Sequence, residues 1–169
     1  MRIGILSDTH DNLRNVEAAA DFLRSEGVVT LLHCGDVCGP AVIEALAGFD
    51  LYVALGNVDR MPALGLAVEA LCGVGRLARW HSLVLDGFAV ALLHGDEEPL
   101  LRHLVRSGEH AYVIYGHTHR RDDRRVRTTR VINPGALGGT RREPRSFCIL
   151  DLETGETRFI ELHEGGRRR

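Results

Sequence analysis

The stretch that decides the fold is RIGILSDTHDNLRNVEAAADFLRSEG, residues 2–27. Its apolar beginning, residues 2–6, stops at Ser7, which predicts a buried strand that ends in a polar loop. Apolar residues then recur at helical spacing as far as Gly27, namely Leu13, Val16, Ala20 and Leu23. Because glycine commonly ends a helix, the stretch predicts a strand, a loop and a helix in that order.

The next stretch repeats this order. Residues 28–32 predict a second strand, residues 41–47 a short helix, and residues 51–55 a third strand. Right-handed crossovers make three such strands parallel. Residues 61–78 mix Pro62 and several glycines with apolar residues, so they predict no single element.

The second half of the chain is richer in strands. Asp86-Gly87 is a two-residue hairpin signal between apolar residues 80–85 and 88–93. A helix is expected at residues 97–106, and further strands at residues 111–115, 123–128, 130–132, 146–151 and 157–162. Both halves fit an α/β sandwich of two mixed sheets packed face to face with helices outside.

The size and composition indicate one globular domain. The chain has 169 residues, of which 44% are hydrophobic and 26% charged. We expect a single domain over residues 1–164 and an arginine-rich tail over residues 165–169. The first residues, MRIGILSDTH, lack the apolar core of a signal peptide, and no segment has the ~20 apolar residues of a membrane span. We therefore expect no membrane contact and a cytoplasmic location.

The charge is small overall and uneven locally. The net charge of -2 gives no strong nucleic-acid signal, and all 21 basic residues are arginine. Residues 120–145 hold nine arginines against three acidic residues. Two interpretations stay open, an attraction for an anionic partner and a solvated hairpin with an arginine-rich outer face.

The cysteines do not form a metal-binding pattern. Cys34, Cys38, Cys72 and Cys148 lack paired C-x-x-C spacing, so free thiols are expected. Cys34 and Cys38 flank Asp36, but a site for hard divalent cations prefers oxygen and imidazole ligands.

Five short polar clusters each follow an apolar strand. They are Asp8-Thr9-His10, Gly35-Asp36-Val37, Gly56-Asn57-Val58-Asp59, His94-Gly95-Asp96 and Gly116-His117-Thr118-His119. In open α/β sheets ligands gather beyond the carboxyl ends of strands, so the five loops are expected to converge. Carboxylate, amide oxygen and imidazole suit Mn, Fe, Ni or Zn. The clusters therefore predict a site for two metal ions.

These clusters, in this order, resemble the calcineurin-like metallophosphoesterases, whose pattern is D-x-H, G-D, G-N, H and G-H-x-H. The short length, the cluster at residues 56–59 and Asn133-Pro134-Gly135 look most like the small bacterial and archaeal phosphodiesterases of that superfamily. The retromer scaffold subunit shares their compact fold. The resemblance covers about residues 1–162 and implies an αββα sandwich.

The resemblance also implies roles for the residues. Asp8, His10 and His119 would hold one divalent ion, and Asn57, His94 and His117 the other. Asp36 would bridge the two ions, which are expected to be Mn, with Ni, Fe or Zn as alternatives. A bridging carboxylate holds two ions about 3.5–4 Å apart, where they polarise a phosphate and activate water. Asp36, Asn57, His94 and Asp59 are the residues expected at the reaction centre, and the substrate is a phosphate-ester small molecule or nucleotide.

Two positions depart from the family pattern. Val58 stands where many relatives have a histidine that serves as a general acid or a phosphate ligand, so the general acid is unassigned. Asp59 is the polar neighbour, and it either transfers a proton or fixes its loop. Ala136 stands where relatives commonly have serine. His33 is interpreted either as a residue that orients a ligand or as an ordinary buried histidine.

Three functions follow from the same residues. A metal-dependent phosphodiesterase is favoured, because the ligand set is complete. A phosphomonoesterase would use the same metal core, and fold does not choose the leaving group. A non-catalytic protein-interaction scaffold like the retromer subunit would show an eroded ligand set. The residues are compatible with a homo-oligomer and do not specify its size.

Overall fold

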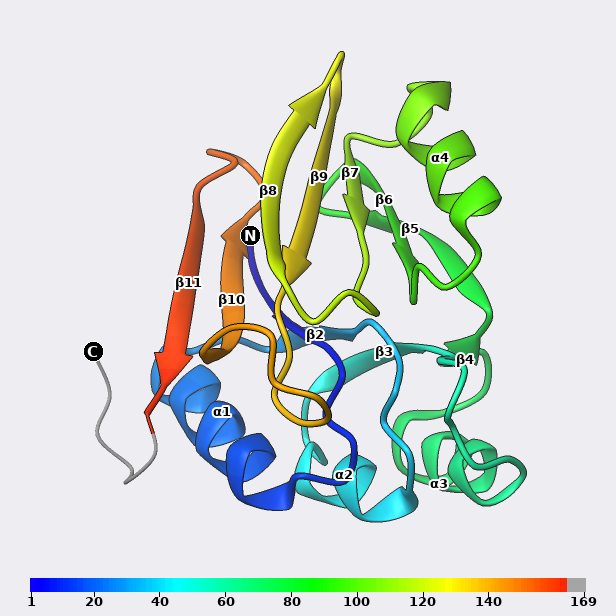
Figure 1. The fold of residues 1–169 in the computed structure, drawn as a ribbon, viewed down its shortest axis with the longest axis vertical. Helices are drawn as coiled ribbons and strands as arrows, with labels where there is room; N and C mark the ends of the chain where they lie inside the picture. The colour runs from blue at the N-terminus through cyan, green and yellow to red at the C-terminus, as the bar shows by residue number, and fades with distance from the viewer. Residues whose placement is uncertain (164–169) are drawn as a thin grey trace.

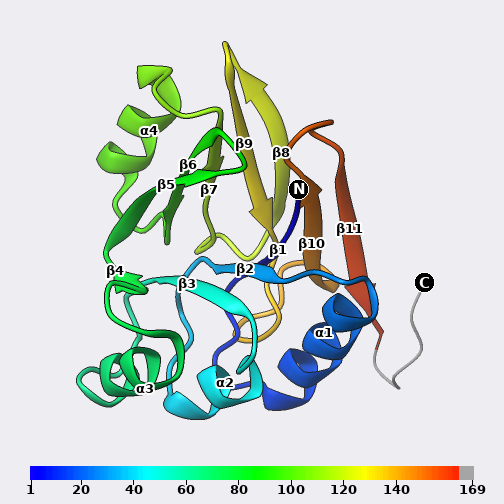
Figure 2. The same cartoon turned by 180° about the vertical axis from the view of Figure 1, so that it is seen from behind.

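The chain forms two β-sheets packed face to face, with helices on both outer sides (Figures 1 and 2). This computed structural model describes residues 1–163. The first sheet contains, in spatial order, β11 (Thr157–Leu162), β10 (Arg145–Asp151), β1 (Arg2–Leu6), β2 (Thr30–His33), β3 (Asp50–Ala54) and β4 (Leu77–Ala78). The second contains β5 (Trp80–Leu85), β6 (Phe88–Leu93), β7 (Tyr112–Ile114), β9 (Thr129–Pro134) and β8 (Arg121–Val126). The predicted αββα sandwich is therefore confirmed.

Both sheets are mixed. Strands β1 to β4 run parallel, as the right-handed crossovers require, and β10 and β11 extend that sheet in antiparallel pairing. In the second sheet β6, β7 and β9 are parallel, with antiparallel β5 and β8 at the two edges. The parallel strands of each sheet deliver their carboxyl ends to one region.

Strand alternation divides the core into three layers. Ile3 and Ile5 of β1 face the second sheet, whereas Leu6 packs on the helical side. The helices on that side are α1 (Leu13–Ser25), α2 (Pro40–Ala45) and α3 (Ala63–Cys72). On the other side, Ala91 and Leu93 of β6 pack against α4 (Glu98–Ser107).

Helix α1 shows how the sequence sets a boundary. The Asn12 side chain accepts a hydrogen bond from the Asn15 N–H and caps the helix. The chain leaves the helix through Gly27, whose φ is 69°. The neighbouring Asp11 side chain accepts a hydrogen bond from the Gly39 N–H at 2.8 Å and so joins this loop to the start of α2.

Several predicted boundaries shift by one or two residues. The strand expected at residues 28–32 is β2, Thr30–His33, and the strand expected at residues 123–128 is β8, Arg121–Val126. The β8–β9 turn consists of residues 127–128, and Arg127 has a φ of 54°. An arginine in this left-handed conformation carries no sequence signal for a turn. The unassigned residues 61–78 contain α3 and β4.

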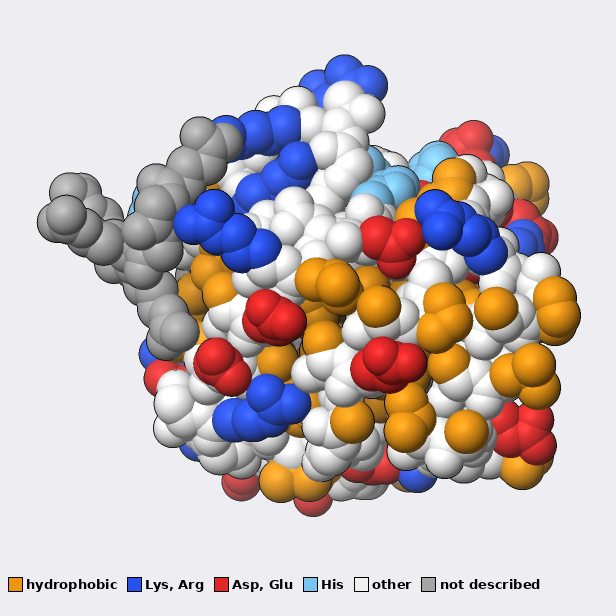
Figure 3. Space-filling model, turned by 90° about the horizontal axis from the view of Figure 1, so that it is seen from below, with side chains coloured by type: hydrophobic (Ala, Val, Ile, Leu, Met, Phe, Trp, Pro, Cys, Tyr) orange, Lys and Arg blue, Asp and Glu red, His pale blue; other side chains and the backbone are white. Residues whose placement is uncertain are grey.

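One face of the molecule exposes apolar side chains. Met61, Leu66, Leu71 and Val74, on or beside α3, are 54%, 66%, 48% and 84% exposed. Figure 3, which looks at the helical side from below, shows apolar side chains spread over the part of that face where α3 lies. Across residues 1–163 there is no helix with the length and apolar character that a membrane crossing requires. The arginine-rich tail predicted at residues 165–169 lies outside the described residues.

Candidate metal centre

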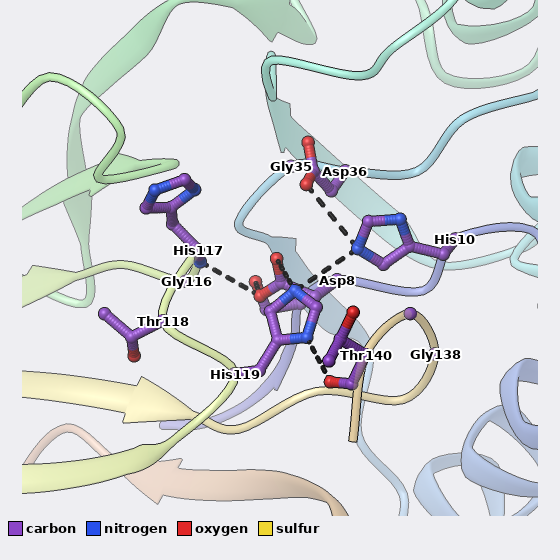
Figure 4. A network of polar contacts seen from close by, with 12 residues as sticks. Asp8, His10, Gly35, Asp36, Gly116, His117, Thr118, His119, Gly138 and Thr140 are labelled. Carbon is purple, nitrogen blue, oxygen red and sulfur yellow. Dashed lines mark hydrogen bonds and ion pairs between the residues drawn. The ribbon is translucent and has the colours of Figure 1, made fainter. Parts of the chain in front are cut away.

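All seven predicted ligand residues lie in loops at the carboxyl ends of five strands. Strands β1, β2 and β3 of the first sheet and β6 and β7 of the second lead into these loops (Figures 1 and 4). Four side chains, those of Asp8, His10, Asp36 and His119, bring one potential ligand atom each to within 4.8 Å of one another. The five sequence clusters thus converge, as sheet topology predicts.

The first group of contacts, here the His119 half, joins the β1 and β7 loops. His119 Nε2 lies 3.3 Å from Asp8 Oδ1 and 3.3 Å from His10 Nε2. His10 Nε2 in turn lies 3.5 Å from Asp36 Oδ2. Asp8, His10 and His119 therefore point at one shared space (Figure 4).

The second group, here the His94 half, centres on His94 Nε2. Asn57 Oδ1 lies 3.1 Å from that nitrogen, His117 Nδ1 3.2 Å, and Asp36 Oδ1 3.3 Å. Asp36 therefore presents Oδ2 to the His119 half and Oδ1 to the His94 half. A single carboxylate lies between the two groups of imidazoles.

The ring tautomers follow from two hydrogen bonds to backbone carbonyls. His119 Nδ1 lies 2.7 Å from the Thr140 carbonyl oxygen, and His94 Nδ1 lies 2.8 Å from that of Cys34. A carbonyl oxygen only accepts, so each Nδ1 carries the proton. In the neutral ring, Nε2 then has an unshared lone pair and can only accept. Each Nε2 then faces a carboxylate oxygen at 3.3 Å. Two facing acceptors require a second proton on the ring or a cation between them.

Asp8 gives an independent test of whether these residues fit a cation. Its Oδ2 accepts hydrogen bonds from the Ser7 hydroxyl at 2.6 Å and from the His117 N–H at 3.0 Å. Its Oδ1 is buried and accepts none. A buried carboxylate oxygen without a partner is costly, and a metal ion would satisfy it. The donor set and the unsatisfied oxygen both fit a divalent metal.

The protonation states favour the same conclusion. Burial raises the pKa of Asp36, but the hydrogen bond and charge of His94 outweigh burial, so the pKa is lowered and the group is a carboxylate. The Asp8 carboxylate, 3.3 Å from His119 Nε2, raises the pKa of His119. Burial lowers the pKa of His94, but Asp36 outweighs it and the net shift is upward. A bound metal would displace these imidazole protons.

The backbone is strained at the candidate ligands. Asp8, His10, Asp36, His117 and His119 have φ between 44° and 65°. Left-handed conformations are uncommon for residues other than glycine and cost of order 1–3 kcal/mol each. Five of the nine such residues in the described chain belong to this site. Surrounding hydrogen bonds therefore hold the ligands in conformations that an isolated loop would avoid.

Two glycines allow the loops to approach one another. A Cβ on Gly116 would lie 1.8 Å from Ser7 Oγ, so only glycine lets the β7 loop lie against the β1 loop. Gly139 has a φ of 59°, and a Cβ there would lie 2.4 Å from His10 Cδ2. The Gly138 N–H also donates to the Asp8 carbonyl at 2.7 Å. Residues 138–140 thus support the His119 half.

The sequence pattern does not mark this supporting loop, or the hydroxyls of Ser7 and Thr9, as parts of the site. Thr140 contributes only its carbonyl oxygen, and any residue carries one, so no motif marks it. Ser7 and Thr9 are adjacent to predicted ligands, but the sequence pattern assigns them no role. The pair Gly138-Gly139 is the one available signal, since consecutive glycines often mark a close backbone approach.

Asp59 and Asn133 connect loops. Asp59 accepts hydrogen bonds from the Cys38 N–H at 2.7 Å and the Gly56 N–H at 2.6 Å. These contacts match the loop-fixing interpretation, and the proton-transfer role stays a prediction. Asn133 donates to the Gly116 carbonyl at 2.7 Å and accepts from the Gly135 N–H, which orders the loop before His117.

His33 supports the site from the core. Its Nδ1 accepts a hydrogen bond from the Gly35 N–H at 3.2 Å, so Nε2 carries the proton and donates to Thr9 Oγ1 at 3.1 Å. Thr9 lies between Asp8 and His10 in sequence. Burial lowers the pKa of His33 to about 4, so the ring is neutral at physiological pH. These contacts match the interpretation of His33 as an orienting residue.

Cys38 and Val58 border the site, but neither side chain offers it a favourable metal ligand. Cys38 Sγ lies 3.8 Å from His10 Nδ1, and burial raises the pKa of this thiol to about 11, which disfavours a thiolate ligand. All four cysteines are free. The Val58 N–H donates to Asp36 Oδ1 at 3.2 Å, and its hydrocarbon side chain is 41% exposed.

The fold and the site together define an αββα protein with a cluster of carboxylates and imidazoles at the ends of its parallel strands. The chain belongs to the calcineurin-like phosphoesterase superfamily, whose domain matches residues 1–155. The prediction of a phosphoric ester hydrolase is confirmed at this level. The candidate centre fits the divalent metals that this superfamily implies.

Individual relatives narrow the comparison. The chain is 33% identical over 165 residues to a phosphodiesterase of Methanocaldococcus jannaschii, covering 96% of this chain and 99% of the relative. The structure of an archaeal phosphodiesterase superposes with a TM-score of 0.90 at 33% identity, covering 96% of this chain and all of the other. Vps29 of Entamoeba histolytica has a TM-score of 0.76 at 22% identity, covering 100% and 98%, and shows the shared fold.

Proposed function

We propose that this protein hydrolyses phosphate diesters with two divalent metal ions. The observation that carries the proposal is Asp36, whose two oxygens lie 3.5 Å from His10 Nε2 and 3.3 Å from His94 Nε2. That arrangement suits a carboxylate that bridges two cations. The similarity to an archaeal phosphodiesterase over nearly the whole chain supports diesters as the substrate class.

The two halves would divide the ions between them. Asp8, His10 and His119 would hold one, Asn57, His94 and His117 the other, and Asp36 would bind both. Manganese is the first candidate, with Ni, Fe or Zn as alternatives that accept the same ligands. When bound, such a pair supplies positive charge to the phosphate oxygens and lowers the pKa of water to near neutrality.

The protein's own residues fix the geometry of that reaction. The Thr140 and Cys34 carbonyls hold His119 and His94 with Nε2 directed inward. The Val58 N–H keeps Asp36 Oδ1 aimed at the His94 half. Val58 cannot donate a proton from its side chain, so we expect diesters with acidic leaving groups to react fastest. Asp59 is the candidate acid, and its present hydrogen bonds must open for it to serve.

The decisive experiment is a panel of metals against substrates. Metal-free protein is reconstituted with Mn, Ni, Fe, Zn or Mg and tested on an aryl diester, an aryl monoester and a cyclic nucleotide. We expect about two bound ions, diester cleavage and loss of activity on chelation. Full activity after exhaustive metal removal contradicts the proposal, and a monoester preference with two bound ions shows the alternative esterase.

The remaining predictions are tested separately. A reconstituted protein that binds two ions and cleaves no ester of any class would favour the non-catalytic scaffold. A cytoplasmic location and self-association stay predictions. Fractionation and light scattering test them.

A further inference from the structure

The arginines of residues 120–145 fall into two groups that differ in their contacts. Arg124 pairs with Asp122 at 2.7 Å, and Arg130 pairs with Asp123 at 2.8 Å. Arg121 contacts Glu143 and Glu161, while Arg145 donates to the carbonyls of residues 138 and 139. These arginines hold the hairpin and the neighbouring loop together, as the solvated-hairpin interpretation predicts.

Two contacts clamp a different pair of arginines beside the metal centre. His119 Nδ1 donates to the Thr140 carbonyl at 2.7 Å, and the Arg121 N–H donates to Glu143 Oε2 at 2.8 Å. Between these tethers lies Arg120 on one segment and residues 141–142 on the other. Arg120 directly follows His119, and Arg142 lies two residues after Thr140, so the two tethers keep both residues close to the His119 half.

These two residues, here called the arginine rim, have no counter-charge. Both are exposed, and within residues 1–163 neither guanidinium makes an ion pair or hydrogen bond. Glu143, the acid of the second tether, is already bound by the N–H and side chain of Arg121. Two exposed arginines that lie within two residues of His119 and Thr140 are thus free to bind an anion, which would accept charge-assisted hydrogen bonds from them.

We propose that the arginine rim binds a second anionic group of the substrate while the metal centre holds the scissile phosphate. This inference rests on the proposed function and narrows its substrate class to diesters that carry a further phosphate. The guanidinium fork matches phosphate oxygens in geometry and charge. An aryl diester without a further phosphate would then bind to the metal centre and not to the arginine rim.

The hairpin itself supplies a matched control. Arg125 and Arg127 lie next to the β8–β9 turn, at the far end of the hairpin from the metal centre (Figure 1). Replacing them with glutamine changes the net charge by the same amount as replacing the rim pair. A comparison of the two double variants therefore separates local binding from long-range attraction.

The test uses a thymidine dinucleotide with and without a 5′-terminal phosphate. For the parent we expect kcat/KM to be higher with the terminal phosphate, and for Arg120→Gln/Arg142→Gln this preference to fall about tenfold or more, because charge-assisted hydrogen bonds are lost. Arg125→Gln/Arg127→Gln should keep the preference. Metal content and an aryl diester activity equal to the parent's show that the rim variant retains its fold and centre.

The outcomes distinguish the two proposals. If the parent cleaves no diester, the proposed function fails. If the parent cleaves the aryl diester and both dinucleotides but does not prefer the phosphorylated one, the rim proposal alone is overturned. An equal loss of preference in both double variants also overturns it, since long-range attraction then explains the effect.

Discussion

The two halves of the candidate metal centre orient an imidazole by the same kind of hydrogen bond, one in the core and one at the surface. In each, an imidazole donates Nδ1–H to a backbone carbonyl and directs Nε2 at a carboxylate. For His94 the carbonyl belongs to Cys34, a fully buried residue directly after β2, and the ring is 1% exposed. For His119 the carbonyl belongs to Thr140 in an exposed loop, and the ring is 12% exposed. The core fixes one anchoring imidazole, and a surface loop fixes the other.

This difference concerns the anchors and not every ligand, since Asn57 and His117 are themselves exposed. We therefore expect the two halves to differ in the free-energy cost of displacing their anchoring imidazoles. A loop with few apolar contacts opens at a smaller free-energy cost than a strand end in the core. Three changes test this comparison, beginning with the residue that the halves share.

The largest effect is expected for Asp36→Asn. Because Asp36 faces both halves, removal of its charge weakens both ion sites, whereas His119→Ala or Asn57→Ala affects one. We expect kcat/KM to fall by at least ~10²-fold and by more than in either single-half variant. Steady-state kinetics and elemental analysis after reconstitution measure the two effects. Parent-like turnover and metal content in Asp36→Asn would show that it does not bridge.

A smaller, one-sided effect is expected for Gly139→Ala. The new Cβ would meet the His10 and His119 rings at 2.4–2.8 Å and push residues 138–140 away from the His119 half. We expect metal affinity in that half to fall ~10–100-fold, the scale of lost supporting contacts around metal ligands, with the His94 half unchanged. Calorimetric titration with Mn resolves the two sites.

The control for this change is Gly87→Ala. Gly87 also has a positive φ, 82°, but a Cβ there meets no atom within 4 Å. It therefore imposes the backbone strain of alanine without the steric contact. Equal metal affinities in the two variants would mean that the 138–140 loop does not support the site.

The contrast between the halves also explains what the sequence can predict. Side chains that carry chemistry stand out after apolar strands, so the sequence alone indicates Asp8, Asp36, His94 and the other candidate ligands. Strand periodicity predicts the edges of β5, β6 and β11 correctly. Supports that act through the backbone, such as the carbonyls of Cys34 and Thr140, carry no residue signature. The same is true of α3, whose apolar side chains follow no clear amphipathic pattern, and of the Arg127 turn.

The smallest expected effect concerns His33, a fully buried histidine that supports the His119 half through Thr9. Burial lowers its pKa from 6.5 to about 4, so the unfolded chain takes up a proton below pH 6.5 while the folded chain does not. The contribution of His33 to stability is therefore complete above pH 6.5 and is lost as the pH falls from there towards 4. Between pH 7 and pH 5 this loss is about 2 kcal/mol, at about 1.4 kcal/mol per pH unit.

The comparison that isolates this effect is the parent against His33→Gln, which cannot titrate but can still accept from the Gly35 N–H and donate to Thr9. Urea unfolding of both, metal-free, at pH 7 and pH 5 cancels the titrations that the two proteins share. We expect the parent to lose about 2 kcal/mol more than the variant across this range. Identical losses of unfolding free energy in the two proteins would show that His33 has the same pKa in the folded and the unfolded chain. Burial would then not keep the His33 imidazole neutral next to the His119 half. The difference between the halves would then be larger than the structure indicates, because the surface loop would be the principal support of the His119 half.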